Sequence, residues 1–405
     1  MTRKEKILII LGIVFLSFNL RAPITAVGSL VDRIQSEYAL TSGMAGFITT
    51  LPLLAFAAVS PFVAGVSRRF GYGKTMFAGL ILVLAGELIR SYTNGVGLFL
   101  GTAFLGVGIA IGNVLIPSII KLKFPQAVGR MTSIYTTCMC TFAAIGAGAS
   151  IPLADGLKLG WKNSLAFWSL LAVVTLILWF PQIKAGARPA VKTTDGGVKE
   201  KFSGSVWKSP VAWWVTLFMG TQSLIFYSLV AWLPTIIVFK GMSGAFAGTM
   251  ALAFQLTALP ATLIIPTLCD KLKNQRGLVF ITCFLYISGM LLFLLGRSQV
   301  VMVPAVLLMA LGMGGSISLS IAFISLRSPN GAKASELSGM SQSAGYLFAA
   351  VGPILLGIIY DVTQSWSIPI MIFAGMILFL AFCGWHAGND VTIEEQKTEL
   401  TAKGA

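Results

Sequence analysis

Arg21 is the residue whose position most clearly predicts chemistry, because it is the single charge in the apolar run from Ile7 to Val31. A guanidinium at bilayer depth costs about 2.5–3.5 kcal/mol on insertion scales, so it usually lines a watery path or pairs with another group. On a continuous helix, one polar stripe would carry Ser17, Arg21, Thr25 and Gly28. The alternative is a structural role, with Arg21 paired to a helix-end carbonyl or a distant carboxylate. We expect a binding role, since no carboxylate lies at comparable depth.

Amide and phenol side chains also lie inside apolar runs. A buried polar group without a partner costs about 1–3 kcal/mol, so each must bond a neighbouring helix, water or a solute. Gln342 and Tyr346 are one turn apart and share a helical face. The predicted solute-binding residues are Asn19, Arg21, Asn113, Tyr135, Gln222, Tyr227, Gln255, Gln342 and Tyr346. They describe a cavity with one cation, several amides and aromatic walls, which suits a small anionic or strongly polar solute.

Glu87 is the only acidic residue well inside an apolar run, and Arg90 follows three positions later. One interpretation is an i, i+3 ion pair near the outer surface. The other is a protonation site that couples solute movement to a proton gradient. Glu87 is therefore a candidate coupling residue, with the ion pair as the alternative.

The composition predicts an all-α membrane protein that crosses the bilayer many times. Hydrophobic residues make up 56% of the chain and charged residues 11%, whereas soluble domains carry about 25% charged residues. His386 is the only histidine, the five cysteines show no ligand spacing, and no Walker motif is present. We therefore expect no catalytic residues, no metal site, no cofactor and no ATP-driven transport. The protein is not expected to be an enzyme.

Twelve apolar runs are each long enough to span a bilayer. They cover approximately 7–31, 44–66, 75–93, 97–120, 129–153, 163–182, 210–238, 244–268, 277–296, 300–325, 335–359 and 366–385. With a cytoplasmic N-terminus, the inside segments hold 22 Lys and Arg residues and the outside segments hold 6. This bias predicts that both termini are cytoplasmic in the plasma membrane. The net charge of +15 is then explained by basic residues at the bilayer surface, so we expect no nucleic-acid partner. We also expect a monomer.

The chain is predicted to contain two similar halves. The segment Phe142-Ala-Ala-Ile-Gly146 matches Phe348-Ala-Ala-Val-Gly352 at an offset of 206 residues, and the same offset carries Gly106 onto Gly312. The expected organisation is a six-helix half at 1–182, a cytoplasmic linker at 183–209, a second half at 210–385 and a cytoplasmic tail at 386–405. Repeats of this kind rock around a solute site near the bilayer midplane.

The loop after the second run reads Ala64-Gly-Val-Ser-Arg-Arg-Phe-Gly-Tyr-Gly-Lys74 and resembles the major facilitator signature G-x-L-a-D-r-x-G-r-r. Two departures are Ala64 at the first glycine and Arg68 at the usual acid. The resemblance implies a twelve-helix major facilitator fold in which this loop's acid joins the two halves. The candidate gating residues are Arg69, Gly71, Pro117, Trp232 and Asp270. Their alternatives are positive-inside topology for the basic residues and interface anchoring for the tryptophan.

More specific stretches are similar to the cyanate and nitroimidazole transporter family within that superfamily. They are Asn19-Leu-Arg-Ala-Pro-Ile-Thr-Ala-Val-Gly28, Gly112-Asn-Val-Leu-Ile-Pro117, Met131-Thr-Ser-Ile-Tyr135-Thr and Phe218-Met-Gly-Thr-Gln-Ser223. The resemblance implies a secondary active transporter that moves a small polar or anionic, cyanate-like solute by rocker-switch alternating access. The alternative is an efflux carrier for neutral or amphipathic toxic compounds such as nitroimidazoles. The sequence leaves the direction of transport open.

Overall fold

A computed structural model describes residues 3–40, 42–183 and 205–393. Within these ranges the chain is helical, and twelve stretches are long and apolar enough to cross a membrane. The first half contains α1 (Arg3–Asn19), α2 (Ala22–Tyr38), α3 (Ser42–Phe70), α4 (Tyr72–Tyr92), α5 (Gly95–Lys123), α6 (Val128–Ile151), α7 (Gly160–Ala166) and α8 (Ser169–Trp179). The second half contains α9 (Pro210–Phe239), α10 (Gly244–Cys269), α11 (Arg276–Leu295), α12 (Gln299–Leu326), α13 (Gly331–Thr363) and α14 (Ser367–Ala387). The twelve predicted spans and the all-α fold are confirmed.

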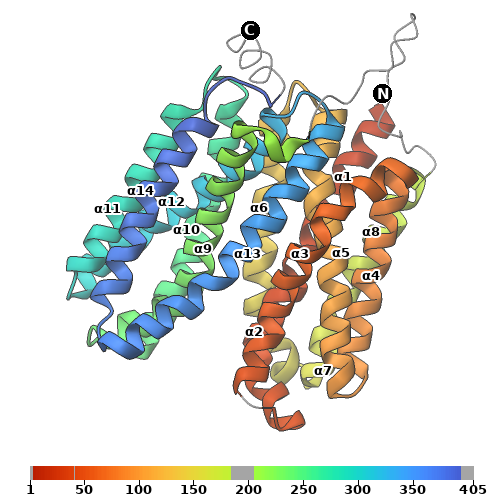
Figure 1. Cartoon of the computed structure of the whole chain (residues 1–405). Coiled ribbons are helices and arrows are strands. Elements are labelled where there is room, and N and C mark those ends of the chain that lie inside the picture. The colour runs from red at the N-terminus through yellow and green to blue at the C-terminus, as the bar shows by residue number, and fades with distance from the viewer. Residues whose placement is uncertain (1–2, 41, 184–204, 394–405) are drawn as a thin grey trace, which may run out of the picture.

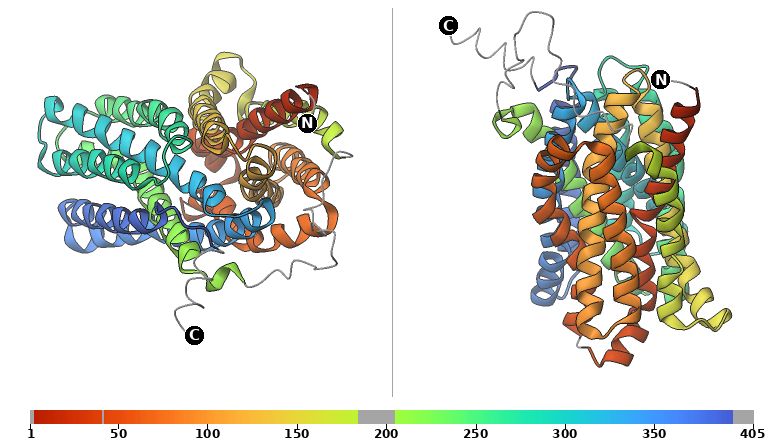
Figure 2. Two further views of the ribbon diagram at one scale, coloured as in Figure 1. Left: turned by 90° about the horizontal axis from the view of Figure 1, so that it is seen from above. Right: turned by 90° about the vertical axis from the view of Figure 1, so that its right-hand side faces the viewer.

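The two halves form two bundles that stand side by side (Figures 1 and 2). The start of α1 and the end of α14 lie on the same face of the molecule, here called the terminal face, and the opposite side is the far face (Figure 1). Towards the far face the ribbons of the two bundles diverge. Contacts between the halves come from α3 and α5 against α13, and from α6 against α10 and α12.

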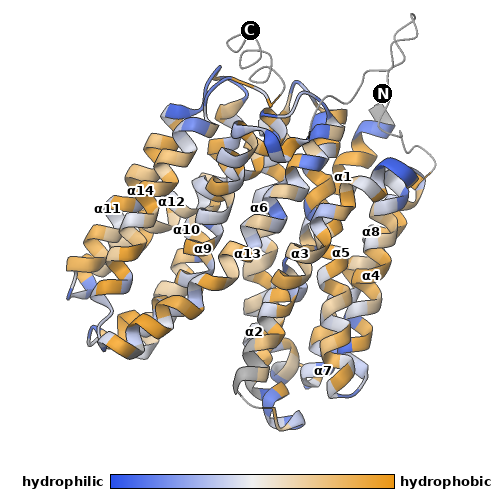
Figure 3. Cartoon of the chain, viewed as in Figure 1, coloured by the Kyte–Doolittle hydropathy of each residue, from blue (hydrophilic) through white to orange (hydrophobic). Residues whose placement is uncertain are grey.

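The outer flanks of the bundles are apolar, and hydrophilic residues gather at the helix ends, chiefly on the terminal face (Figure 3). Large hydrophobic side chains such as Phe62, Ile177 and Leu378 are more than half exposed. In a water-soluble protein such a surface would be a liability. In a bilayer it is the expected boundary with lipid.

The first span is broken at Leu20–Arg21, so the prediction of a continuous helix there is wrong. Pro23 has no backbone N–H to donate to the carbonyl of Asn19, and proline is tolerated in the first turn of a new helix. Helix α2 therefore starts at Ala22, with Arg21 at its N-cap and Pro23 in its first turn. Of the residues in the predicted stripe, Ser17 is fully buried and donates to the carbonyl of Ile13, and the Thr25 hydroxyl donates to the carbonyl of Arg21 over 3.2 Å.

The predicted linker at 183–209 is described only at its ends. Short 3-10 helices cover Phe180–Ile183 and Val206–Lys208, and residues 184–204 lie outside the described residues. The predicted tail at 386–405 is described as far as Ile393. The backbone N–H of Ile393 donates to the carbonyl of Arg327 over 3.0 Å, so the described part of the tail packs against the end of α12.

Glycines allow a close contact between α4 and α5 inside the first half. A Cβ atom added at Gly101 on α5 would lie 2.6 Å from the carbonyl oxygen of Gly86 on α4. Real Cβ atoms do not approach backbone this closely, so the two helices pack through bare backbone, as small residues allow in membranes.

We expect Gly101→Ala to lower the melting temperature of the purified protein, because overpacking a tight contact costs roughly 1–3 kcal/mol. The matched control is Gly148→Ala on α6, where an added Cβ atom would meet no other atom within 4 Å. Equal losses of melting temperature in both variants would show that the α4–α5 contact is not specially tight.

Candidate functional site

A small cavity lies where the two halves meet, and seven of the nine predicted solute-binding residues line it. Those seven are Arg21, Asn113, Tyr135, Gln222, Tyr227, Gln342 and Tyr346. The free volume is about 20 Å³, and a single water needs roughly 10–15 Å³. A larger solute can therefore occupy the site only when side chains or the two halves move apart.

The cavity is bridged by a hydrogen bond between the halves. Arg21 donates from Nη1 to the Tyr227 hydroxyl over 2.7 Å. Tyr227 lies 206 positions after Arg21, which is the offset of the internal repeat, so the two residues occupy equivalent places in the two halves. Among the described residues, Arg21 forms no ion pair with a carboxylate. Its charge therefore faces a neutral phenol and has no counter-charge.

The amides of the cavity keep unused hydrogen-bonding capacity. Gln222 donates to the Ser223 hydroxyl over 2.9 Å, and its Oε1 atom is buried without a hydrogen-bond partner. The Oε1 atom of Gln342 is also buried without one. A polar solute would remove this cost of about 1–3 kcal/mol for each group.

Aromatic and polar side chains complete the wall. Tyr135 donates its hydroxyl to Oδ1 of Asn113 over 3.3 Å. The ring of Tyr346 lies 6.3 Å from the ring of Tyr227 and 5.0 Å from that of Phe56, measured between centroids. The sequence analysis missed the remaining lining residues Met139, Met219, Ser223, Phe226, Ile317, Ser320 and Ile321. Of these residues, only Ser223 and Ser320 carried a signal in the sequence, namely a hydroxyl inside an apolar run.

Two predicted residues are placed elsewhere. Asn19 donates to the Thr175 hydroxyl over 2.8 Å and to the carbonyl of Phe15 over 2.8 Å, inside the first half. Gln255 on α10 is half-buried and is absent from the cavity wall. The structure therefore does not bring these two amides to the other seven residues.

Glu87 and Arg90 lie together inside the first half, and both are fully buried. Arg90 donates from Nη1 to the carbonyl of Pro23 over 2.8 Å, in the first turn after the break that carries Arg21. Both carboxylate oxygens of Glu87 are buried without a hydrogen-bond partner. No ion pair between these two described residues is present, so the predicted pair does not form.

The candidate gating residues divide into those that join the halves and those that do not. Asp270, after α10, accepts from the backbone N–H groups of Gly129 and Arg130 over 2.7 and 2.9 Å, at the positive N-terminal end of α6. Pro117 accepts at its carbonyl from the Ser325 hydroxyl over 3.0 Å. Both contacts cross between the halves.

The other three candidates make the contacts described here within one half. Arg69 is exposed and lies over the ring of Phe70. Gly71 caps α4 with a φ of 86°, a conformation that favours glycine. Trp232 donates its indole N–H to the carbonyl of Pro353 over 2.9 Å, inside the second half.

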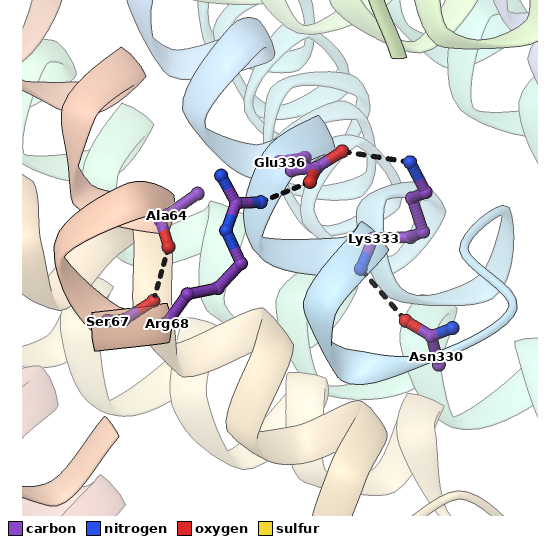
Figure 4. A network of polar contacts seen from close by, with 6 residues as sticks. All are labelled: Ala64, Ser67, Arg68, Asn330, Lys333 and Glu336. Atoms are coloured by element: carbon purple, nitrogen blue, oxygen red, sulfur yellow. Dashed lines mark hydrogen bonds and ion pairs between the residues drawn. The ribbon is translucent and has the colours of Figure 1, made fainter. Parts of the chain in front are cut away.

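The residue that joins the halves at this loop is Arg68, whose role the sequence analysis did not predict. Arg68 at the end of α3 forms an ion pair with Glu336 on α13, and Lys333 pairs with the same carboxylate over 3.0 Å (Figure 4). A basic residue replaces the signature acid here, and the acid stands on the opposite half. A cavity of about 530 Å³ adjoins this cluster on the terminal face.

The hydrogen bonds that join the described residues of the two halves lie at the level of Arg21 or on its terminal-face side. Examples are Ser338 to the carbonyl of Asn113, Ser343 to the carbonyl of Ala57 and Ser133 to the carbonyl of Leu263. Towards the far face the ribbons of the two bundles diverge (Figure 1). The halves are thus joined at the terminal face and parted at the far face.

We expect Arg68→Glu to open the terminal face, because two carboxylates would then face each other. A partly exposed pair contributes up to about 1 kcal/mol, a change of about fivefold in an equilibrium. Opening is measured as maleimide labelling of Ser338→Cys, a buried position between the halves, in a background without the five native cysteines.

The charge-swapped Arg68→Glu/Glu336→Arg variant should restore the low labelling of the parent. Arg69→Glu is the matched control, since Arg69 is exposed and adjacent in the sequence. Equal labelling in Arg68→Glu and Arg69→Glu would show that the Arg68–Glu336 pair does not hold the halves together.

Comparison with known proteins identifies the family. The model of the Major Facilitator Superfamily matches residues 7–350. The chain is 43% identical to the uncharacterized transporter YycB of Bacillus subtilis, with 94% of each chain covered. It is 39% identical to the 2-nitroimidazole transporter of Escherichia coli, over 96% of this chain and 98% of the relative. It is 25% identical to the cyanate transport protein CynX of Escherichia coli, over 92% and 96%.

The fold comparison agrees with the family. The proton:xylose symporter XylE superimposes with a TM-score of 0.80 at 14% identity, over 97% of this chain and 98% of that structure. At this identity the likeness shows the fold alone. Together with the twelve spans and the cavity between two bundles, these matches show that the chain belongs to the Major Facilitator Superfamily and is a membrane transporter rather than an enzyme.

Proposed function

We propose that the protein is a secondary active transporter for a small polar or anionic solute, cyanate-like in size and charge, that binds opposite Arg21. The supporting observation is the guanidinium in the cavity between the halves, which donates to the Tyr227 hydroxyl, lies beside Tyr346 and forms no ion pair with a carboxylate among the described residues. A solute anion would supply the missing counter-charge. A guanidinium carries a fixed charge and several N–H donors, so more than one of them can donate to a terminal atom of a small linear anion such as cyanate.

Alternating access would require the contacts between the halves on the terminal-face side to break and re-form. The contacts on the terminal-face side are ion pairs, hydroxyl-to-carbonyl bonds and the bonds of Asp270 to two backbone N–H groups of α6, and water can replace each of them. If the termini are cytoplasmic, as the distribution of Lys and Arg predicts, the structure has an outward-facing arrangement. A solute that bonds Arg21, Tyr227 and the amides at the same time would favour closure of the two halves around it.

A second solute class is favoured by one comparison and by the aromatic wall. The 39% identical relative is named for 2-nitroimidazole, a flat heterocycle. Tyr227, Tyr346 and Phe226 offer ring faces on which such a molecule could stack. The unpaired amide atoms of Gln222 and Gln342 could bond its ring nitrogens. In that case the protein would act as an efflux carrier for neutral toxic compounds.

We expect cyanate to raise the melting temperature of the wild-type protein but not that of Arg21→Ala. A ligand at a hundred times its Kd stabilises the folded state by about 2.7 kcal/mol. Arg21→Lys should lose most of the effect, because an ammonium cannot donate the paired bonds of a guanidinium. The control is Arg33→Ala, which removes a cation that pairs with Asp155 away from the cavity.

The two solute classes give different results in the same assay. Stabilisation by 2-nitroimidazole in wild type and Arg21→Ala alike, without any effect of cyanate, would contradict the anion proposal. It would leave Arg21 with a structural role and favour the efflux carrier.

Glu87 is the candidate residue for coupling to protons, since it is a fully buried carboxyl whose oxygens accept no hydrogen bond. We expect Glu87→Gln, which mimics the protonated form, to abolish the dependence of uptake on an imposed pH gradient while solute exchange without a gradient persists. Uptake is measured in proteoliposomes. If Glu87→Gln responds to the gradient as wild type does, the carboxyl is structural and the coupling role is wrong.

A further inference from the structure

A second cavity of about 380 Å³ lies on the far face of the second half, away from the site between the halves. It is formed at the end of α9, the end of α11 and the start of α14. The lining residues are Phe239, Lys240, Gly241, Leu294, Arg297, Trp366, Ser367 and Ile370. This set, called the far-face pocket below, shares no residue with the central cavity. It contains two cations and no carboxylate or amide side chain.

Lys240 is held in place by the end of a neighbouring helix. Its Nζ atom donates to the carbonyls of Leu294 and Gly296 over 2.9 and 3.0 Å, at the C-terminal end of α11. An ammonium has three N–H donors, so one remains available. Partial burial lowers the pKa of Lys240, and the nearby charge of Arg297 lowers it further. The site thus brings two like charges together, an arrangement that a bound anion would relieve.

Arg297 has no recorded hydrogen bond or ion pair with any residue that the structure describes. Two far-face cations of the first half are paired with carboxylates: Arg33 with Asp155, and Lys162 with Glu37 over 2.7 Å. In the second half, neither Lys240 nor Arg297 is paired with a carboxylate among the described residues. Among the described residues, the two cations of the far-face pocket therefore have no counter-charge.

Two further residues belong to the same wall. Trp366 is 2% exposed, and its indole N–H is buried without a hydrogen-bond partner. Ser367 is the first residue of α14, a 21-residue helix, and its backbone N–H donates to the Ser365 hydroxyl over 3.2 Å. The N-terminal end of a helix carries a partial positive charge that favours anions. Every polar side chain of the pocket is thus a cation, an N–H donor or a hydroxyl.

We propose that the far-face pocket binds an oxyanion of the phosphate type, supplied by a phospholipid headgroup or by free inorganic phosphate. Arg and Lys are the side chains that recognise phosphate, the former through paired N–H groups and the latter as a point charge. The apolar wall of Phe239, Leu294 and Ile370 fits an amphiphile whose chains run along the helices. The pocket lies where the helices end, which is the level of lipid headgroups, and basic pockets between helices bind such headgroups.

The test uses the full-length purified protein and native mass spectrometry with phosphatidylglycerol, phosphatidylcholine and inorganic phosphate as separate probes. Arg297→Gln is the main variant, because Arg297 makes no recorded structural bond and the protein should still fold. We expect it to bind phosphatidylglycerol at least about fivefold more weakly than wild type, a loss of about 1 kcal/mol. Arg297→Lys, which keeps the charge, should retain most of the binding, and Lys240→Gln should weaken it.

The matched control is Lys158→Gln, which removes a positive charge from the far face of the first half without touching the pocket. Binding of phosphatidylglycerol but not of inorganic phosphate, lost in Arg297→Gln, would identify the ligand as a lipid headgroup. Binding of inorganic phosphate with the same loss would identify a free oxyanion. The proposal would be overturned if wild type, Arg297→Gln and Lys158→Gln bound each of the three probes equally well.

Discussion

The structure depends on one uncompensated positive charge at the boundary between its two halves. Arg21 stands at a break in the first span and donates to the phenol of Tyr227 on the other half. A neutral hydroxyl satisfies one N–H group but leaves the net charge in place, and such a charge inside a membrane protein is costly unless water or a partner reaches it. The surrounding amides and tyrosines are the polar environment that makes the charge tolerable, and the same environment makes a solute site.

The repeat in the sequence gives Arg21 and Tyr227 corresponding positions, but the two halves differ there: the first span is broken at Leu20–Arg21, whereas α9 runs unbroken through Tyr227. Arg21 and Tyr227 are equivalent by position, yet one is a cation and the other a neutral phenol. At the terminal face, Asp270 binds the start of α6, whereas the equivalent contact at the start of α13 is the ion pair of Arg68 with Glu336. Equivalent helices thus meet in equivalent places, while the residue types decide which half contributes charge and which contributes acceptors.

Contacts between the halves combine close packing with exchangeable hydrogen bonds. A Cβ atom added at Gly129 on α6 would collide with the carbonyl oxygen of Pro266 on α10, so backbone lies against backbone there as it does at Gly86 and Gly101 inside the first half. Serine hydroxyls also bond carbonyls across the halves, as with Ser338 to Asn113 and Ser343 to Ala57. Such bonds contribute about 0.5–1.5 kcal/mol each and can be exchanged for water.

The sequence by itself determined the membrane class, the twelve spans and the repeat, because these follow from hydrophobic length and from local similarity that need no partner to be read. It also marked Arg21, Gln222 and Tyr346, since a polar group in an apolar run is conspicuous whatever it contacts. Only the tertiary structure decided which of these groups meet. Asn19 and Gln255 carried the same signal as Asn113, but helix rotation and packing turned them away from the cavity. The Arg68–Glu336 pair joins residues 268 positions apart, and no local pattern specifies a partner at that distance.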